Sequence, residues 1–340
     1  MRQMNERTVF EEVFASGPVS CPQLSELTGI SKPTVASAIR SLEAAGVVRV
    51  SGRSSGHLGR TGLLYSVASD GGYVVAVDIG VRAVRVAIGD LTGSMVARSD
   101  VDTPGNDLGA IVDVVAVLIR DCLRRVRSRR ACVLASVVGS PGAVDPRRPG
   151  LTHVGRLTCL DGVDLASMLR DRTGLSMVVE NDVNLAALGE QAGGESSRNM
   201  VVFLVGEGVG AGLIIDGRLI RGPRGAAGEI EAVPFGGATR QRRALLPASR
   251  AGVARYVALR VSALAAITDA ELVVLTGDVG LDRALLAPVR RLVAGHLVEP
   301  PRIEVSALGD AAVLLGGLAS AHSAGLKRLF SNPLLRARSA

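Results

Sequence analysis

Closely spaced cysteine pairs and long apolar runs are both missing from this 340-residue chain. Its four cysteines are scattered with no C-x-x-C spacing, which argues against a disulfide framework and against a zinc site. The longest uncharged apolar-rich stretch, residues 311–326, has 16 residues, whereas a membrane helix needs roughly 20. The opening MRQMNERTVF contains no signal core, so we expect a globular cytoplasmic protein without membrane contact.

Lysine is also scarce, and this weakens the simplest interpretation of the charge. The formal charge of +7 favours a polyanionic partner such as nucleic acid. Only Lys32 and Lys327 are lysines, however, and the other 37 basic residues are arginines, a bias typical of a GC-rich genome. The distribution of charge along the chain therefore has to decide whether a binding surface exists.

Residues 1–70 differ in pattern from the rest of the chain. An amphipathic segment from Arg7 to Ala15 stops at Gly17-Pro18, and Ser20-x-x-Gln23 then predicts a capping box at the start of a second helix. A third helix is predicted from Ser31 to Ala45, with Ser31 as its cap and apolar residues at helical spacing. Two strand-like runs follow, around a tip rich in Gly and Ser. Together these elements predict a winged helix-turn-helix domain.

The charge of this segment favours DNA as its partner. The third helix leaves hydrogen-bond donors on its outward face, and no acidic residue occurs between Glu43 and Asp70. Such donors bond to phosphates and base edges, and a local excess of positive charge is typical of nucleic-acid binding. The alternative is a small helical module that serves only dimerisation. The predicted DNA-binding residues are Lys32, Thr34, Ser37 and Arg40 on the helix and Arg53 and Arg60 in the wing.

Four motifs stand in order in residues 71–340. They are GSPGAVD at 139–145, VENDVNLAALGE at 179–190, GEGVGAGLIIDGRLIRGPRGAAGEI at 206–230 and ALGDAAVLLGGLA at 307–319. In order and wording they resemble the repressor, open reading frame, kinase (ROK) family. The resemblance implies an α/β domain with an actin-like and hexokinase-like (ribonuclease H-like) fold and a cleft between two lobes. It places lobe 1 at about 71–184 plus a C-terminal helix at about 315–340, and lobe 2 at about 185–314.

Comparison with the sugar kinases of that family predicts that their chemistry has been lost. In those kinases the Asp of the Glu-Asn-Asp motif is the general base; here it is Asp182, beside Asn181 as a sugar ligand. Their first phosphate loop reads Asp-x-Gly-Gly-Thr, whereas Val81 and Arg82 fill the last two places here and obstruct a phosphate. The second loop has the anionic Glu207 where Thr is usual. We therefore expect no enzymatic activity, with Asp182 as a vestigial base.

The sugar end of the expected cleft is altered as well. After Gly-Glu-x the family continues with Gly-His, and that His serves both the sugar and a zinc ion, whereas here Glu231-Ala232 follows Gly228-Glu229-Ile230. The cysteine-rich zinc loop of the family is replaced by PFGGATRQRRALLPASR. We expect neither a structural zinc nor another cofactor. Asn181, Asp182 and Glu229 remain as predicted ligand-binding residues, and the alternative is that the helix-start residues only cap and pack.

These observations predict a DNA-binding transcriptional regulator, a repressor of carbohydrate-related genes. We expect it to act as a homodimer or homotetramer on a double-stranded DNA operator, with a sugar or sugar phosphate in the interlobe cleft as its effector. Two alternatives stay open. One is a ROK sugar kinase with an added DNA-binding module, and the other is a ligand-independent regulator that uses the ROK domain only as an oligomerisation scaffold.

Overall fold

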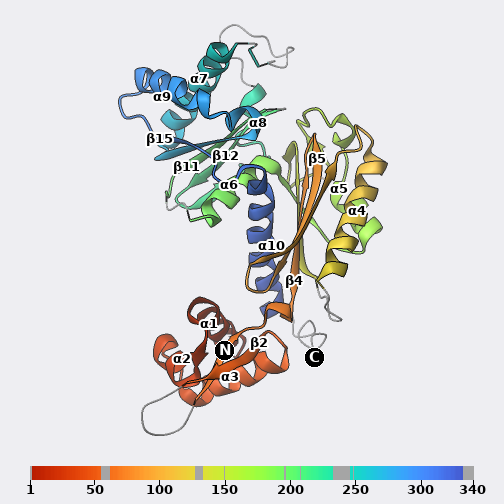
Figure 1. Ribbon diagram of the computed structural model, residues 1–340, viewed down its shortest axis with the longest axis vertical. Helices are drawn as coiled ribbons and strands as arrows, with labels where there is room; N and C mark the ends of the chain where they lie inside the picture. The colour runs from red at the N-terminus through yellow and green to blue at the C-terminus, as the bar shows by residue number, and fades with distance from the viewer. Residues whose placement is uncertain are drawn as a thin grey trace.

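The computed structural model consists of a small N-terminal domain and two α/β lobes (Figure 1). The small domain lies at one end of the elongated molecule, and helix α10 (Ala312–Ser331) extends from the region between the lobes toward it. The structure describes residues 2–54, 62–126, 133–148, 150–194, 197–206, 208–232, 246–247 and 249–331.

The N-terminal domain forms because local signals mark where its helices begin. Its elements are α1 (Arg2–Ser16), β1 (Val19–Ser20), α2 (Cys21–Thr28), α3 (Lys32–Ala44), β2 (Val48–Arg53) and β3 (Leu63–Val67). Ser20 caps α2 through the Gln23 N–H, and the Gln23 side chain accepts from the Ser20 N–H, so the predicted capping box is confirmed. Ser31 occupies the N-cap position of α3, but its hydroxyl bonds to the Thr34 hydroxyl at 2.9 Å instead of to the backbone. The strands form one sheet in the order β1-β3-β2.

The first lobe is a mixed five-stranded sheet with helices on both faces. Its elements are β4 (Tyr73–Ile79), β5 (Ala83–Asp90), β6 (Met95–Asp102), α4 (Leu108–Arg125), β7 (Val133–Ser140), α5 (Leu165–Thr173) and β10 (Val178–Asn181). The strand order is β10-β7-β4-β5-β6, with β4, β7 and β10 parallel. Apolar residues of α4 and α5 cover one face, and α10 packs on the other. A small hairpin of β8 (Ala143–Val144) and β9 (Leu151–Thr152) lies between β7 and α5 in the chain.

The second lobe repeats this layered arrangement. Its elements are α6 (Asp182–Ala192), β11 (Met200–Val205), β12 (Val209–Ile215), β13 (Arg218–Ile220), α7 (Arg250–Thr268), β14 (Leu272–Thr276), α8 (Gly277–Gly280), α9 (Arg283–His296) and β15 (Arg302–Val305). The strand order is β13-β12-β11-β14-β15. Helices α7 and α9 pack on one face, and α6 packs on the other. By length and composition α7 is apolar enough to cross a membrane, but 56% of its apolar window is buried, as in a core helix.

Helices α6 and α10 touch backbone to backbone where the lobes meet. A Cβ atom on Gly316 would lie 1.8 Å from the Leu185 carbonyl oxygen, and one on Gly189 would lie 2.2 Å from the Ala312 carbonyl oxygen. Only glycine permits this approach. The cleft end of α10 is therefore fixed against the helix that starts at Asp182.

The other end of α10 packs against the N-terminal domain. The ring centroids of Phe330 and Phe10 are 5.3 Å apart, and those of His322 and Phe14 are 5.5 Å apart. A tilted aromatic pair of this kind contributes about 0.5–1.5 kcal/mol beyond its buried area. One helix thus connects the interlobe region to the domain that contains α3. The predicted C-terminal helix extended to residue 340, and residues 332–340 lie outside the described part of the chain.

Candidate functional site

Helix α3 presents a polar face to solvent. Val35 and Ile39 on its inner face are almost fully buried, which fixes the rotation of the helix about its axis. Of the predicted DNA-binding residues on the helix, Lys32, Ser37 and Arg40 are exposed and Thr34 is partly buried. Each can therefore donate a hydrogen bond to a group outside the protein, and their role in DNA binding stays a prediction.

The wing is described only at its base. Arg53 ends β2 and is exposed, whereas Arg60 and the tip lie in residues 55–61, outside the described ranges. Arg49 forms an exposed ion pair with Asp70 at 3.6 Å, so the acidic residue that ends this basic segment offsets part of its charge. Among the described residues, Lys32, Arg40 and Arg53 are the exposed cations of the predicted DNA-binding set.

A cavity of about 240 Å³ lies between the lobes. Asp182 at the start of α6, Asn181 before it and Glu229 from the second lobe all line the cavity, together with Arg82 and Asp278. The structure therefore brings the three predicted ligand-binding residues to one cavity. Their role in ligand binding stays a prediction.

The side chain of Asn181 is engaged in hydrogen bonds within the chain. Its Oδ1 accepts hydrogen bonds from the N–H groups of Val183 at 3.0 Å and Asn184 at 3.2 Å, so it caps α6. Its Nδ2 donates to the Gly142 carbonyl at 2.9 Å, and the residue is 7% exposed. For Asn181 the capping interpretation therefore explains these contacts without a ligand.

Asp182 and Glu229 have environments that resist ionisation. Burial, and then the charge of Asp78, raise the pKa of Asp182 to about 7. Burial, and then the charge of Glu231, raise the pKa of Glu229 to about 7. Among the described residues, no arginine or lysine pairs with either carboxyl group. At neutral pH both groups can therefore donate or accept hydrogen bonds, which suits the hydroxyls of a sugar.

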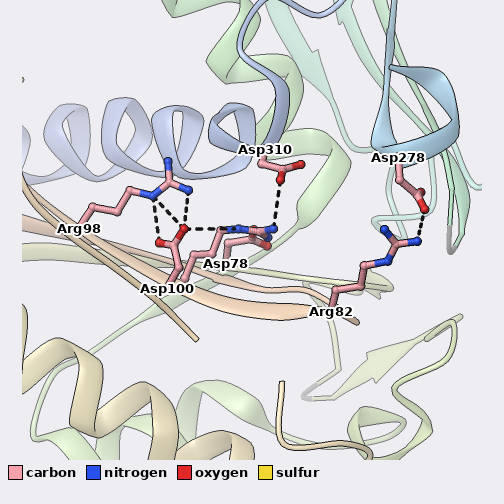
Figure 2. Close-up of polar contacts among 7 residues, drawn as sticks. Asp78, Arg82, Arg98, Asp100, Asp278 and Asp310 are labelled. Atoms are coloured by element: carbon pink, nitrogen blue, oxygen red, sulfur yellow. Dashed lines mark hydrogen bonds and ion pairs between the residues drawn. The ribbon is translucent and has the colours of Figure 1, made fainter. Parts of the chain in front are cut away.

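Arg85 lies among three carboxylates, those of Asp78, Asp100 and Asp310, which Figure 2 labels. Its guanidinium lies 2.9 Å from the buried Asp78 carboxylate and 3.5 Å from Asp310, which precedes α10, and 4.0 Å from Asp100. Arg85 is 17% exposed and Asp78 6%. Burial still raises the pKa of Asp78 to about 6, although the Arg85 charge opposes the shift. A guanidinium therefore occupies the side of Asp78 that faces Asp310.

Arg82 connects the two lobes (Figure 2). It follows β4, and its guanidinium forms an ion pair with Asp278 in α8 of the second lobe. Gly206 makes room for this carboxylate, because a Cβ atom there would lie 1.9 Å from Asp278 Oδ1. Glu207, which the sequence predicts to repel phosphate, lies outside the described residues, as does most of the segment that replaces the zinc loop. Within the described ranges, no group of three His, Cys, Asp or Glu side chains could hold a metal ion.

The sequence contains one signal for the Arg85 network. β4 and β5 form a tight hairpin in which Asp78 pairs with Arg85, so an acidic and a basic residue face each other across the turn. Arg82 and Asp278 carry no such signal, because 196 residues separate them.

Comparison with known proteins agrees with this architecture. Residues 74–236 match the ROK family, and residues 6–49 match the winged helix-turn-helix DNA-binding family. The chain carries a ROK family domain behind a winged helix-turn-helix domain. The predicted resemblance and fold class are therefore confirmed. The boundaries predicted for the domains and lobes stay predictions.

The relatives of this chain include proteins named as regulators and proteins named as kinases. It is 24% identical over 232 residues to a xylose repressor of Bacillus spizizenii, covering 68% of this chain and 60% of that protein. It is 33% identical over 170 residues to a glucokinase of Streptomyces coelicolor, covering 48% of this chain and 51% of that protein. The chain thus spans about three fifths of the length of the first curated relatives that it matches.

A solved structure extends the likeness to the whole fold. The crystal structure of a ROK family transcriptional regulator, a homologue of the E. coli MLC protein, superposes with a TM-score of 0.74 at 16% identity. The match covers 100% of this chain and 99% of that one, including the winged helix-turn-helix domain. At this identity the likeness shows the fold.

Proposed function

We propose that this ROK chain is a DNA-binding transcriptional repressor whose affinity for its operator changes when a sugar binds between the lobes. The observation that carries the proposal is the polar, exposed face of α3 within a winged helix-turn-helix domain, joined by α10 to the interlobe cavity. The repressor names of the relatives support the same assignment and suggest carbohydrate-related genes.

DNA binding places α3 in the major groove. There Lys32, Ser37 and Arg40 reach base edges, and Arg53 at the base of the wing contacts phosphates. Two copies related by a two-fold axis read a two-fold-symmetric operator, so a homodimer or a homotetramer is the functional unit. Phosphate contacts supply affinity, and base contacts supply sequence preference.

The interlobe cavity is where a sugar controls the affinity for the operator. Asp182 and Glu229 bond to the hydroxyls of a sugar, and closure of the lobes around it moves the cleft end of α10. Because the far end of α10 packs on Phe10 and Phe14 of α1, this movement changes the position of the winged helix. The transition is a rigid-body shift of domains, in which the ligand favours one of two arrangements.

Selection of genomic DNA fragments by the purified chain at physiological salt tests the DNA-binding part. A two-fold-symmetric site should be recovered, and Arg40→Ala should weaken binding to it by about 10- to 100-fold, as loss of a base contact does. Arg218→Ala is the matched control, since Arg218 is exposed on β13 of the second lobe and should have no effect. Recovery of only salt-sensitive binding without sequence preference would refute the regulator.

A sugar kinase is the second candidate. The observation that favours it is Asp182, which lines the cavity with a pKa of about 7, suitable for a general base. ATP-dependent phosphorylation of any sugar in a broad panel, abolished by Asp182→Asn, would support this candidate. We expect no turnover. Asp78 and Asp278, which line the cavity near the expected phosphate loops, are held in ion pairs by Arg85 and Arg82.

A further inference from the structure

The outer end of the cavity, defined as Arg82, Arg85, Asp78, Asp278 and Asp310, is lined by ion pairs within the chain. Arg82 pairs with Asp278 across the two lobes, and Arg85 pairs with Asp78 and Asp310 (Figure 2). Each arginine of this group therefore already has a carboxylate partner. The remaining three members are all carboxylates.

This arrangement disfavours a phosphate group on the ligand. A phosphate that bound Arg82 would have to displace Asp278 and would leave that carboxylate next to a dianion. Arg85 offers no relief, because Asp78 and Asp310 hold it. Like charges in a partly desolvated site raise the free energy of the complex. An uncharged ligand avoids this cost.

The size of the cavity also favours a small ligand. About 240 Å³ lies below the range of roughly 300–1,000 Å³ that is usual for small-molecule pockets. This space suits a single sugar ring. The ion pair between Arg82 and Asp278 joins the two lobes at the outer end.

We propose that Arg82 and Asp278 determine the class of effector: their ion pair spans the lobes at the outer end of the cavity and keeps a carboxylate there, so that the cavity accepts an unphosphorylated sugar and rejects sugar phosphates and nucleotides. The inference rests on the proposed sugar site and deepens it. Arg82 and Asp278 act here as specificity-determining residues.

Binding measurements on the full chain test this proposal. The probes are free monosaccharides, among them xylose and glucose, each compared with its own phosphate ester by thermal shift and calorimetry. At least one free sugar should bind, and its phosphate ester should bind at least tenfold more weakly. Asp278→Asn should reduce the ratio of the two dissociation constants, ester over free sugar, by about tenfold. The phosphate dianion would then no longer lie next to a carboxylate beside Arg82.

A second variant removes the arginine of the ion pair. Arg82→Thr should weaken binding of the free sugar by about two- to fivefold, since an exposed ion pair contributes little. It should not strengthen binding of the phosphate ester. Asp171→Asn, an exposed carboxylate on α5, is the control for the change of charge and should alter neither ligand.

The outcomes separate this proposal from the function on which it rests. A wild-type chain that prefers the phosphate ester overturns the proposal and leaves a sugar-responsive regulator intact. In that case Arg156 and His153, which also line the cavity, would be the groups to replace next. An Asp278→Asn chain with an unchanged ratio also overturns it. If neither a sugar nor an ester binds, the proposed effector site is itself wrong.

Discussion

The two ends of the interlobe cavity differ in what surrounds their carboxyl groups. At the inner end, no described arginine or lysine pairs with Asp182 or Glu229, and both carboxyl groups have a pKa of about 7. At the outer end, Asp78 and Asp278 each have an arginine partner. The carboxyl groups of the inner end can therefore gain or lose a proton when a ligand binds, whereas those of the outer end, including Asp78 with its pKa of about 6, lie against arginines. In the proposed function, this contrast favours the hydroxyls of a sugar and disfavours a phosphate donor.

The largest expected effect comes from the outer end. Arg85→Met removes the partner of the buried Asp78 carboxylate, and loss of one partner of a buried ion pair costs about 3–5 kcal/mol of unfolding free energy. Urea unfolding at pH 8 measures this loss. Adding Asp78→Asn should restore part of the stability, because no buried charge then remains. A loss below about 1 kcal/mol for Arg85→Met would mean that ion pairs do not hold this end.

The inner end should respond in the opposite direction. The pKa of Asp182 in the folded chain, about 7, lies above its unfolded value, so the folded state binds the extra proton. The resulting stability is complete below the unfolded pKa and is lost as the pH rises through about 7. Asp182→Asn should therefore raise the unfolding free energy by about 1–3 kcal/mol at pH 8 and change it little at pH 4.

Thermal melts of wild type and Asp182→Asn between pH 4 and pH 8 measure this difference. Asp171→Asn again controls for the change of charge at an exposed site. Equal slopes of melting temperature against pH in wild type and Asp182→Asn would show that Asp182 ionises normally, and the contrast between the two ends would fail.

The smallest effect concerns Glu231. Its charge contributes to the raised pKa of Glu229, after burial. Glu231→Gln should therefore lower the pKa of Glu229, as followed by carboxyl carbon NMR. Unfolding free energy should change by less than about 0.5 kcal/mol, as is usual for substitutions that leave packing intact. An unchanged pKa would leave burial as the whole cause of the shift.

Much of the N-terminal domain could be predicted from the sequence because helix ends depend on neighbouring residues. Ser20 and Gln23 meet within one turn, and Gly29 adopts the left-handed conformation that ends α2. The side chain of Ser31 departed from expectation because a second hydroxyl, that of Thr34, was within reach. Local competition of this kind decides details and leaves the helix itself in place.

The cleft was predictable only in part. The motif resemblance brought Asn181, Asp182 and Glu229 into one candidate site, and all three line the cavity. Capping by Asn181 was an alternative that the sequence left open, whereas the contact between Arg82 and Asp278 was not foreseen. Such a contact depends on how two lobes come together, and no local pattern records it. The Asp78–Arg85 pair, which follows from the hairpin register, was within reach of sequence reasoning.

The central claim is that the cavity and the DNA-binding face are energetically coupled. The most direct test is a titration of the selected operator fragment with the full chain, without sugar and at a saturating concentration of a sugar that binds. Coupling between two sites typically changes affinity by about 5- to 150-fold, and we expect a change in this range. An operator affinity that stays within about twofold, with sugar binding established in the same samples, would contradict the account.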